Sequence, residues 1–362
     1  MRSELEPRIF HSLDALRGIA AIGVVMFHIG AAFWPLAAPG GYLAVDLFFM
    51  MSGVVLSHAY EPRFRSGMST YGFMRARLVR LYPLYLLGLL FGIAVTLASL
   101  LGRNSVNWDA ASLTQAALLA LFFLPNFSSA PVNQLFPLNI PCWSLFFELV
   151  VNLLFVLTWP LLTTRRLILT LLVTAAVIVW AVLNIGHLDQ GSTAATFVVG
   201  LARTIFGFSL GVLIARHLPQ VKRTTSNLGV LALVAVFALV IFAAPHGHWR
   251  QLWDAACVLL VFPAMVYVAT FVDPGPRAQR VATFLGLTSY AVYVLHSPLS
   301  SVMNSVSRHF AGDGPDAAHF GAPYVGFAVL FLLLIGCWVV DRFFDMPIRN
   351  WLNRKLPRQP GT

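Results

Sequence analysis

Arg17 and His28 are eleven residues apart in the first long apolar stretch of the sequence, LDALRGIAAIGVVMFH. Eleven residues make three turns of an α-helix, so both side chains lie on nearly one face, about 16 Å apart along the axis. Ionisable residues inside a bilayer are costly and usually functional. The spacing predicts a functional pair. The alternative is that Arg17 anchors the cytoplasmic end of a span and His28 hydrogen-bonds a neighbouring helix.

A cluster of arginines follows the second apolar stretch. Five arginines lie within 18 residues, and Arg77 and Arg80 are three apart, which places them on one helical face. The planar guanidinium binds two phosphate oxygens at once, and the chain has 22 arginines against two lysines. The cluster predicts a cytoplasmic site for a polyanion. Membrane orientation and contact with anionic lipid are the alternative interpretation.

Four more ionisable residues occur within apolar stretches. Glu148 lies about one and a half turns into PCWSLFFELVVNLLF, where a carboxylate is expected to be paired or protonated. Arg203, in TFVVGLARTIF, is its candidate structural partner. Asp46 begins the stretch DLFFMMSGVV and is expected either to form a salt bridge or to shape a site. His296 lies in the outer part of TSYAVYVLHSPL.

Metal and thiol chemistry are not expected. Cys142, Cys257 and Cys337 are widely scattered and form no CxxC pair. Cys142 as a covalent nucleophile lacks a neighbouring base in the sequence. His246 and His248 have no third ligand nearby, so we predict no metal site.

The elements that must position these residues are membrane helices. The chain of 362 residues is 58% hydrophobic and only 10% charged, with mean hydropathy +0.78. Its apolar runs are close to the roughly 20 residues that cross a bilayer. We predict an all-α polytopic membrane protein of about ten transmembrane helices, at 16–34, 42–60, 81–101, 143–162, 166–184, 195–215, 227–244, 252–271, 284–304 and 323–341. The short apolar run 113–124 predicts a re-entrant or interfacial segment.

The basic residues set the orientation. With ten spans and both termini cytoplasmic, 20 of the 24 lysines and arginines fall on the cytoplasmic side, as the positive-inside rule requires. The net charge of +10 therefore encodes topology, and we expect membrane lipids but no nucleic acid as partners. We predict one transmembrane domain over residues 1–345 and a short basic cytoplasmic tail over 346–362.

The order of these motifs resembles the acyltransferase-3 family of integral-membrane O-acyltransferases. The similar segments cover essentially the whole chain and are LDALRGIAAIGVVMFH, VDLFFMMSGVVLSHAY, RLVRLYPLYL, CWSLFFE, TSYAVYVLHSPL and DRFFDMPIRNW. One departure is Asp345-Met346-Pro347, where the family usually has Glu-x-Pro. The resemblance implies transfer of an acyl group, usually acetyl, from acyl-CoA to a hydroxyl of a cell-surface or secreted saccharide at the bacterial inner membrane.

The resemblance also implies roles. His28 matches the histidine regarded as catalytic, for which we expect a general base, and Arg17 matches the arginine of the same motif. Arg77 and Arg80 match the arginine pair that handles the CoA donor, and we expect Arg17 and Arg75 to bind the donor with them. We expect Glu148 to orient His28, acetyl-CoA to be a co-substrate with no permanently bound cofactor, and polysaccharide-assembly proteins as further partners. The residues expected to support the acceptor site or the oxyanion are Asp46, Ser52, Trp143, Ser144, Arg203, Tyr290, Tyr293 and His296.

Two other functions fit part of the pattern. A transporter or flippase of a lipid-linked saccharide would use Glu148, Arg203 and His296 to line a path, but transporters usually show internal repeats, and none is evident. A non-catalytic assembly factor for polysaccharide export would tolerate loss of His28.

Overall fold

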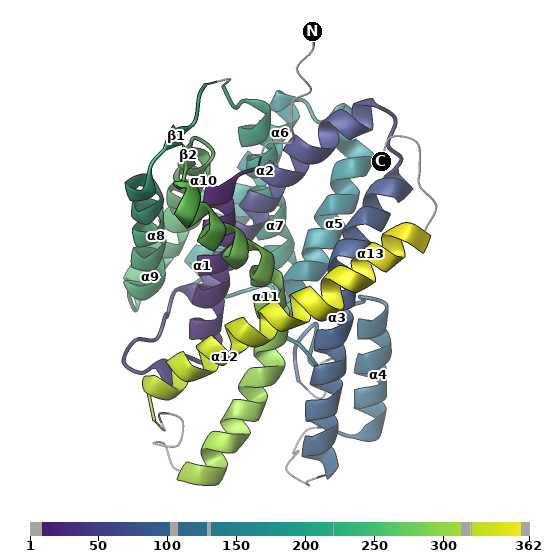
Figure 1. The fold of residues 1–362 in the computed structure, drawn as a ribbon, viewed down its shortest axis with the longest axis vertical. Helices are drawn as coiled ribbons and strands as arrows, with labels where there is room; N and C mark the ends of the chain where they lie inside the picture. The colour runs from purple at the N-terminus through teal and green to yellow at the C-terminus, as the bar shows by residue number, and fades with distance from the viewer. Residues whose placement is uncertain are drawn as a thin grey trace.

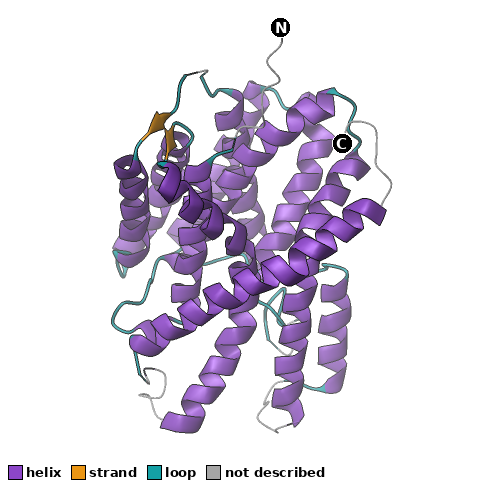
Figure 2. Cartoon of the chain, in the orientation of Figure 1, coloured by secondary structure: helices purple, strands orange, loops and turns teal. Residues whose placement is uncertain are grey.

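The computed structural model describes residues 9–101, 108–128, 132–219, 221–312, 319 and 321–355, and the chain is helical over most of them (Figures 1 and 2). The α-helices are α1 (His11–His28), α2 (Ala44–Arg65), α3 (Thr70–Leu101), α4 (Ala110–Leu121), α5 (Cys142–Thr158), α6 (Thr164–Ile185), α7 (Phe197–Arg216), α8 (Asn227–Phe242), α9 (His248–Ala256), α10 (Phe262–Ala269), α11 (Pro276–Ala311), α12 (Tyr324–Val340) and α13 (Met346–Lys355). The predicted all-α fold class is confirmed.

Short irregular elements join these helices. Two π-helical turns, Cys257–Val261 and Asp341–Asp345, connect α9 to α10 and α12 to α13. The strands β1 (Thr224–Thr225) and β2 (Val272–Asp273) form one short parallel pair. The 3-10 turns are Gly30–Phe33, Gly41–Leu43, Trp159–Leu161 and Ala194–Thr196.

Seven helical stretches of the described chain are long and apolar enough to cross a membrane. They are Gly41–Arg65, Thr70–Leu101, Cys142–Leu161, Thr164–Ile185, Ala194–Arg216, His248–Ala269 and Tyr324–Lys355. The other three predicted spans correspond to α1, α8 and α11. Helix α1 carries Asp14 and Arg17, and α8 is apolar but only 16 residues long. The chain is a membrane protein, while ten spans and their orientation stay predictions.

Helix α4 occupies most of the predicted re-entrant segment. Its 12 residues reach about 18 Å, which is shorter than the roughly 30 Å hydrocarbon layer. Asp109 caps its first turn by accepting a hydrogen bond from the Ser112 amide at 2.7 Å. At the other end the hydroxyls of Tyr85 and Tyr82 on α3 donate to the carbonyls of Ala120 and Leu121, at 2.6 and 2.8 Å. Helix α4 therefore packs beside α3 (Figure 1).

Glycines bring α2 and α7 into close contact. A Cβ on Gly53 would lie 2.1 Å from the carbonyl oxygen of Phe208, and one on Gly211 would lie 2.2 Å from that of Met50. Gly207 and Gly211 form a GxxxG motif, which lets two membrane helices approach closely. This contact fixes the rotation of α2 about its axis, so that Asp46 points to Arg203 of α7 and Ser52 to Glu148 of α5.

Small residues on α1 serve the same purpose. A Cβ on Gly18 would lie 2.3 Å from the Leu285 side chain of α11, and one on Gly23 would lie 3.1 Å from Ile241 of α8. The groups that approach α1 at these glycines are thus neighbouring helices. The close packing of α1 on α11 sets the relative positions of Arg17, His28 and His296.

Candidate active site

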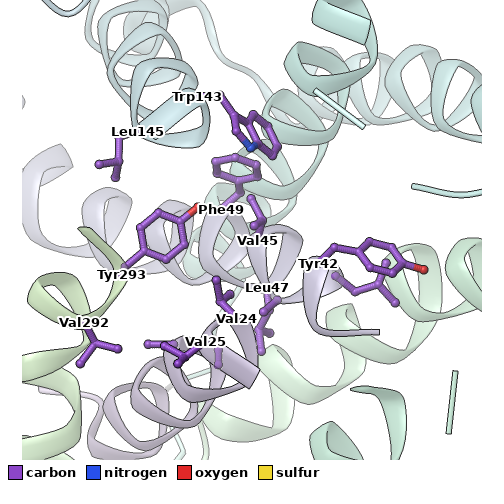
Figure 3. Packing of buried hydrophobic residues seen from close by; sticks show 14 of the residues in the cluster. Val24, Val25, Tyr42, Val45, Leu47, Phe49, Trp143, Leu145, Val292 and Tyr293 are labelled. Atoms are coloured by element: carbon purple, nitrogen blue, oxygen red, sulfur yellow. The ribbon is translucent and has the colours of Figure 1, made fainter. Parts of the chain in front are cut away.

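A cavity of about 270 Å³ lies among α1, α2, α3, α5 and α11. Arginines from two helices face it, and carboxylate, hydroxyl and aromatic side chains complete the wall. Figure 3 shows part of the apolar wall, where Tyr293 of α11 points its ring toward Phe49 of α2. The lining residues are Arg17, Val45, Phe48, Phe49, Ser52, Val55, Leu56, Arg77, Arg80, Leu81, Ser144, Leu145, Glu148, Gly286, Ser289, Tyr290 and Tyr293. We call this hollow the arginine cavity.

Glu148 holds one of the arginines. Its Oε1 lies 3.1 Å from a terminal nitrogen of Arg77 and accepts a hydrogen bond from Ser52 at 2.5 Å. The structure thus pairs Glu148 with the arginine cluster, and neither His28 nor Arg203 is its partner, contrary to both expectations. Depth explains the difference, because Glu148 faces the arginines near the first turns of α3 and His28 ends α1 at its far end. The Arg77 Nε is buried without a hydrogen-bond partner among the described residues.

Asp345 holds another of the arginines. Its Oδ2 lies 3.3 Å from Arg80 and 3.0 Å from Arg349, and its side chain is fully buried. The π-helical turn Asp341–Asp345 carries this carboxylate, so the shorter side chain that replaces the family's glutamate still reaches Arg80. The Arg80 guanidinium also lies 5.8 Å from the Tyr290 ring centroid. No local pattern predicts this contact, because Arg80 and Asp345 are 265 positions apart in the chain.

Arg17 and His28 lie on one continuous helix, as their spacing predicts. Arg17 lines the arginine cavity and pairs with Asp14 at 3.1 Å. His28 is the last residue of α1 and its side chain is exposed. Its Nδ1 lies 2.9 Å from the carbonyl oxygen of Val24, and since a carbonyl only accepts, Nδ1 donates. The neutral ring therefore keeps its lone pair on Nε2.

His296 lies against His28. The two ring centroids are 4.9 Å apart, and His296 is only 1% exposed. Its Nδ1 also bonds a carbonyl one turn back, that of Val292, at 3.1 Å. The buried Nε2 of His296 has no hydrogen-bond partner in the described part of the chain. An unpaired buried acceptor is energetically unfavourable, and this one lies inside the helix packing, on the ring that contacts His28.

Tyr293 connects the arginine cavity to the histidines. It lines the cavity, and its ring centroid lies 6.0 Å from that of His296. Its hydroxyl lies 2.6 Å from the Ser144 hydroxyl and donates to the Pro141 carbonyl at 3.2 Å. Neither His28 nor His296 lines the cavity itself, so the histidine pair lies outside it, in contact with Tyr293 of its wall.

Three predicted acceptor-site residues are structural. Arg203 donates from Nε and a terminal nitrogen to Asp46, at 3.0 and 2.6 Å, and both side chains are 1% exposed. The Trp143 ring lies under this guanidinium, with 5.8 Å between the ring centroid and the Arg203 Cζ. Trp143 is buried against Gly191. The arginine cavity contains none of the three, so the pair joins α7 to α2 instead of contacting a ligand there.

Breaking this pair is expected to destabilise the fold. Asp46→Ala leaves the Arg203 charge buried and unpaired, which costs about 3–5 kcal/mol in the free energy of unfolding. Thermal unfolding of the protein in nanodiscs measures the loss. The double variant Asp46→Ala/Arg203→Met removes both charges and should recover most of it. An unchanged midpoint for Asp46→Ala alone would contradict the assignment.

The other predicted residues divide between the cavity and its surroundings. Tyr290, Ser52 and Ser144 line the cavity, but each hydroxyl already has a protein partner: Leu81 for Tyr290, Glu148 for Ser52, and Pro141 with Tyr293 for Ser144. Arg75 is half-buried and does not line it. Gly286 and Ser289 also line the cavity and were not predicted, although they share the helical face of Tyr290 and Tyr293 and were detectable from that spacing.

Comparison with known proteins gives consistent matches. The acyltransferase-3 family model, described as "Acyltransferase domain", matches residues 10–342. "Protein 2 in picA locus" of Rhizobium radiobacter is 37% identical over 187 residues, 49% of this chain and 97% of that protein. The O-acetyltransferase OatA of Staphylococcus aureus is 23% identical over 372 residues, 95% of this chain and 58% of OatA. A putative O-acetyltransferase of Staphylococcus aureus strain MRSA252 is 22% identical over 391 residues, 97% of this chain and 60% of that protein.

No solved structure matches the chain significantly. The chain spans less than two thirds of the length of the two O-acetyltransferases. The family match, in contrast, covers nearly all described helices, including every helix that contributes to the arginine cavity. The chain therefore belongs to the acyltransferase-3 family of membrane O-acyltransferases.

Proposed function

We propose that the protein transfers an acyl group, in the first place acetyl, from acyl-CoA to a hydroxyl of a saccharide. The observation that carries this proposal is that Arg17, Arg77 and Arg80 converge on one cavity while His28 lies three turns farther along the helix of Arg17. Three turns are about 16 Å, which is of the order of the pantetheine arm that separates the CoA phosphates from the thioester.

The arginines are prepared for an anion. Glu148 holds Arg77 and Asp345 holds Arg80, so both guanidinium groups are fixed before a ligand arrives. Each guanidinium carries five N–H donors, and the carboxylates use only part of them. Both arginines line the cavity, so donors that the carboxylates leave free are available to phosphate oxygens. In this proposal Glu148 positions an arginine of the donor site.

His28 supplies the proton transfer. Its Nε2 takes the proton of the acceptor hydroxyl while that oxygen attacks the thioester carbonyl, and a tetrahedral intermediate forms. The intermediate collapses as the carbon–sulfur bond breaks, and the imidazolium returns the proton to the leaving thiolate. The products are free CoA and the O-acyl ester. The Val24 carbonyl fixes the tautomer that this step requires, which is the role expected of Glu148.

The proposal includes a location. If acyl-CoA enters from the cytoplasm, the arginine cavity must open to the cytoplasmic side. This agrees with the positive-inside rule, which places the surrounding arginines on that side. We place the protein in the bacterial inner membrane with both termini cytoplasmic. A saccharide or lipid-linked saccharide, membrane lipids and polysaccharide-assembly proteins are its proposed partners.

Labelled acetyl-CoA tests the function without knowledge of the acceptor. Purified protein in nanodiscs is expected to bind acetyl-CoA saturably and to release free CoA slowly by transfer to water. A protein that binds no acetyl-CoA would contradict the proposal and favour the transporter or flippase alternative. Binding without any release of CoA over many hours would favour the assembly-factor alternative.

Loss of the Asp345 carboxylate should weaken donor binding. Asp345→Asn removes the charge that holds Arg80, and we expect acetyl-CoA affinity to fall about threefold to tenfold, because Arg80 is partly exposed and the contact is partly screened. Asp341→Asn is the matched control in the same turn, since Asp341 lies 3.9 Å from Arg349. Equal affinities for the two variants in a filter-binding assay would refute the role of Asp345.

A further inference from the structure

A second hollow, of about 990 Å³, lies between the C-terminal halves of α3 and α11. Figure 1 shows these halves extending with α4 at the lower end of the molecule. We call this hollow the α3–α11 groove. Its lining residues are Gly92, Val95, Thr96, Ala98, Ser99, Trp108, Pro137, Leu138, Ile140, Ser297, Pro298, Ser301, Val302, Asn304, Ser305 and Val306.

The groove approaches the arginine cavity along α11. Tyr290 and Tyr293 line the cavity, and Ser297 and Ser301 line the groove on continuing turns of the same helix. Tyr293 and Ser297 are one turn apart, about 6 Å along the axis. This turn also carries His296, whose ring lies against His28. Ser297, the first residue of α11 in the lining of the groove, directly follows His296, so the groove begins beside this turn.

The floor of the groove is fixed. Pro298 has no N–H, so the carbonyl of Val294 lacks its usual partner within α11. The Asn139 side chain donates to that carbonyl at 2.9 Å. On the α3 side, a Cβ on Gly92 would lie 2.1 Å from the Leu138 carbonyl oxygen, so only glycine allows the connecting segment to sit this close. These contacts hold residues 137–140 between α3 and α11 as a preformed surface.

The lining chemistry differs sharply from that of the arginine cavity. Hydroxyl groups from both helices and the Asn304 amide of α11 interrupt an otherwise apolar lining, and none of the described lining residues is charged. Some of these hydroxyls donate to their own helix, as Thr96 does to Gly92, but a hydroxyl keeps lone pairs that accept further bonds. Trp108 adds an aromatic side chain to this wall. Uncharged polar groups beside an aromatic ring suit a neutral polyhydroxyl ligand better than an anion or a lipid chain.

We propose that the α3–α11 groove binds the acceptor, and that the acceptor is a neutral saccharide whose reactive hydroxyl reaches the turn of α11 that carries His296. This inference rests on the proposed function. The volume of about 990 Å³ is at the upper end of the range for small-molecule sites and accommodates more than one sugar ring.

Two blocking variants test the groove from opposite walls. Ala98→Trp fills it from α3 and Ser301→Trp fills it from α11. Ala94→Trp is the matched control, because Ala94 is also exposed on α3, one turn earlier, and does not line the groove. The assay is release of CoA from acetyl-CoA in nanodiscs, with a panel of neutral methyl glycosides, a methyl glucuronide and decanol as acceptor probes.

We expect neutral glycosides to stimulate CoA release saturably in the wild type and in Ala94→Trp. In Ala98→Trp and Ser301→Trp the glycoside KM should rise at least tenfold, while acetyl-CoA affinity and glycoside-independent release stay unchanged. Stimulation that is insensitive to both blocking variants would overturn the proposal, and so would no stimulation by any neutral glycoside or a response to glucuronide or decanol alone. If glycoside-independent release is itself absent, the proposed function fails rather than the groove.

Discussion

Replacing His28 by alanine is expected to lower acyl transfer by about 10²–10⁴-fold, the usual contribution of a general base. Acetyl-CoA affinity should be unchanged, because His28 does not line the arginine cavity. The reason is geometric as well as chemical: the Nδ1 proton is committed to the Val24 carbonyl, so only Nε2 can accept the hydroxyl proton. Initial rates of transfer and equilibrium donor binding, measured on the same nanodisc preparation, check both halves of the prediction.

His217 provides the matched control. It also follows a helix, α7, and its Nδ1 also bonds a carbonyl one turn back, that of Leu213, at 3.0 Å. It lies away from the arginine cavity and the groove. His217→Ala should keep normal transfer. Full activity of His28→Ala in membranes of normal protein content would contradict the mechanism.

Removing both Arg77 and Arg80 is expected to weaken acetyl-CoA binding at least 100-fold. Each charged hydrogen bond to a phosphate contributes about 1.5–3 kcal/mol, and the double variant removes the contacts from α3 together. The dissociation constant of the double variant for acetyl-CoA should rise. Its transfer rate at saturating acetyl-CoA should change less. Isothermal titration with acetyl-CoA and with desulfo-CoA locates the loss at the nucleotide part of the donor.

Arg165 and Arg166 provide the control pair. They are exposed at the start of α6 and are predicted to lie on the same side of the membrane. Arg165→Ala/Arg166→Ala removes the same formal charge, so it reports any general loss of attraction for an anion. If this control weakens donor binding as much as the α3 variant does, the arginine cavity is not a specific site.

Much of the site could be predicted from local spacing. The Arg17–His28 interval and the Arg77–Arg80 interval are properties of single helices, and a helix keeps its spacing wherever it packs. Hydropathy likewise located the helices, because apolar length is a local property. Both spacings agree with the structure. Arg17 and His28 lie on α1, and Arg17 lines the same cavity as Arg77 and Arg80.

The pairing of buried charges could not be predicted in this way. The sequence presents Arg203 with two acids, Asp46 and Glu148, at similar depths. The choice depends on which helices touch, and the glycine contact of α2 with α7 places Asp46 beside Arg203. Glu148 on α5 is left to face Arg77 on α3. Such contacts are set by packing between segments distant in the sequence. The residue pattern within one helix does not predict them.

The count of spans shows a similar limit. Helix α1 is polar at its start because it carries Asp14 and Arg17, and α8 is short, so neither satisfies simple length and hydropathy criteria. Both nevertheless pack into the helical core, where Gly23 of α1 meets Ile241 of α8. Charged functional residues lower the mean hydropathy of a helix, and a short helix fails the length criterion. Membrane spans are therefore hardest to identify at the helices that build the site.

The measurement that tests the central claim most directly is a single-turnover experiment with labelled acetyl-CoA. Wild type, His28→Ala and Arg77→Ala/Arg80→Ala in nanodiscs are compared for donor bound at equilibrium and for the rate at which the acetyl group leaves CoA. We expect His28→Ala to bind donor normally but to release acetyl at least 100-fold more slowly, and the arginine variant to fail at binding. Release at the wild-type rate by His28→Ala, or normal donor binding by the arginine variant, would contradict the proposed mechanism.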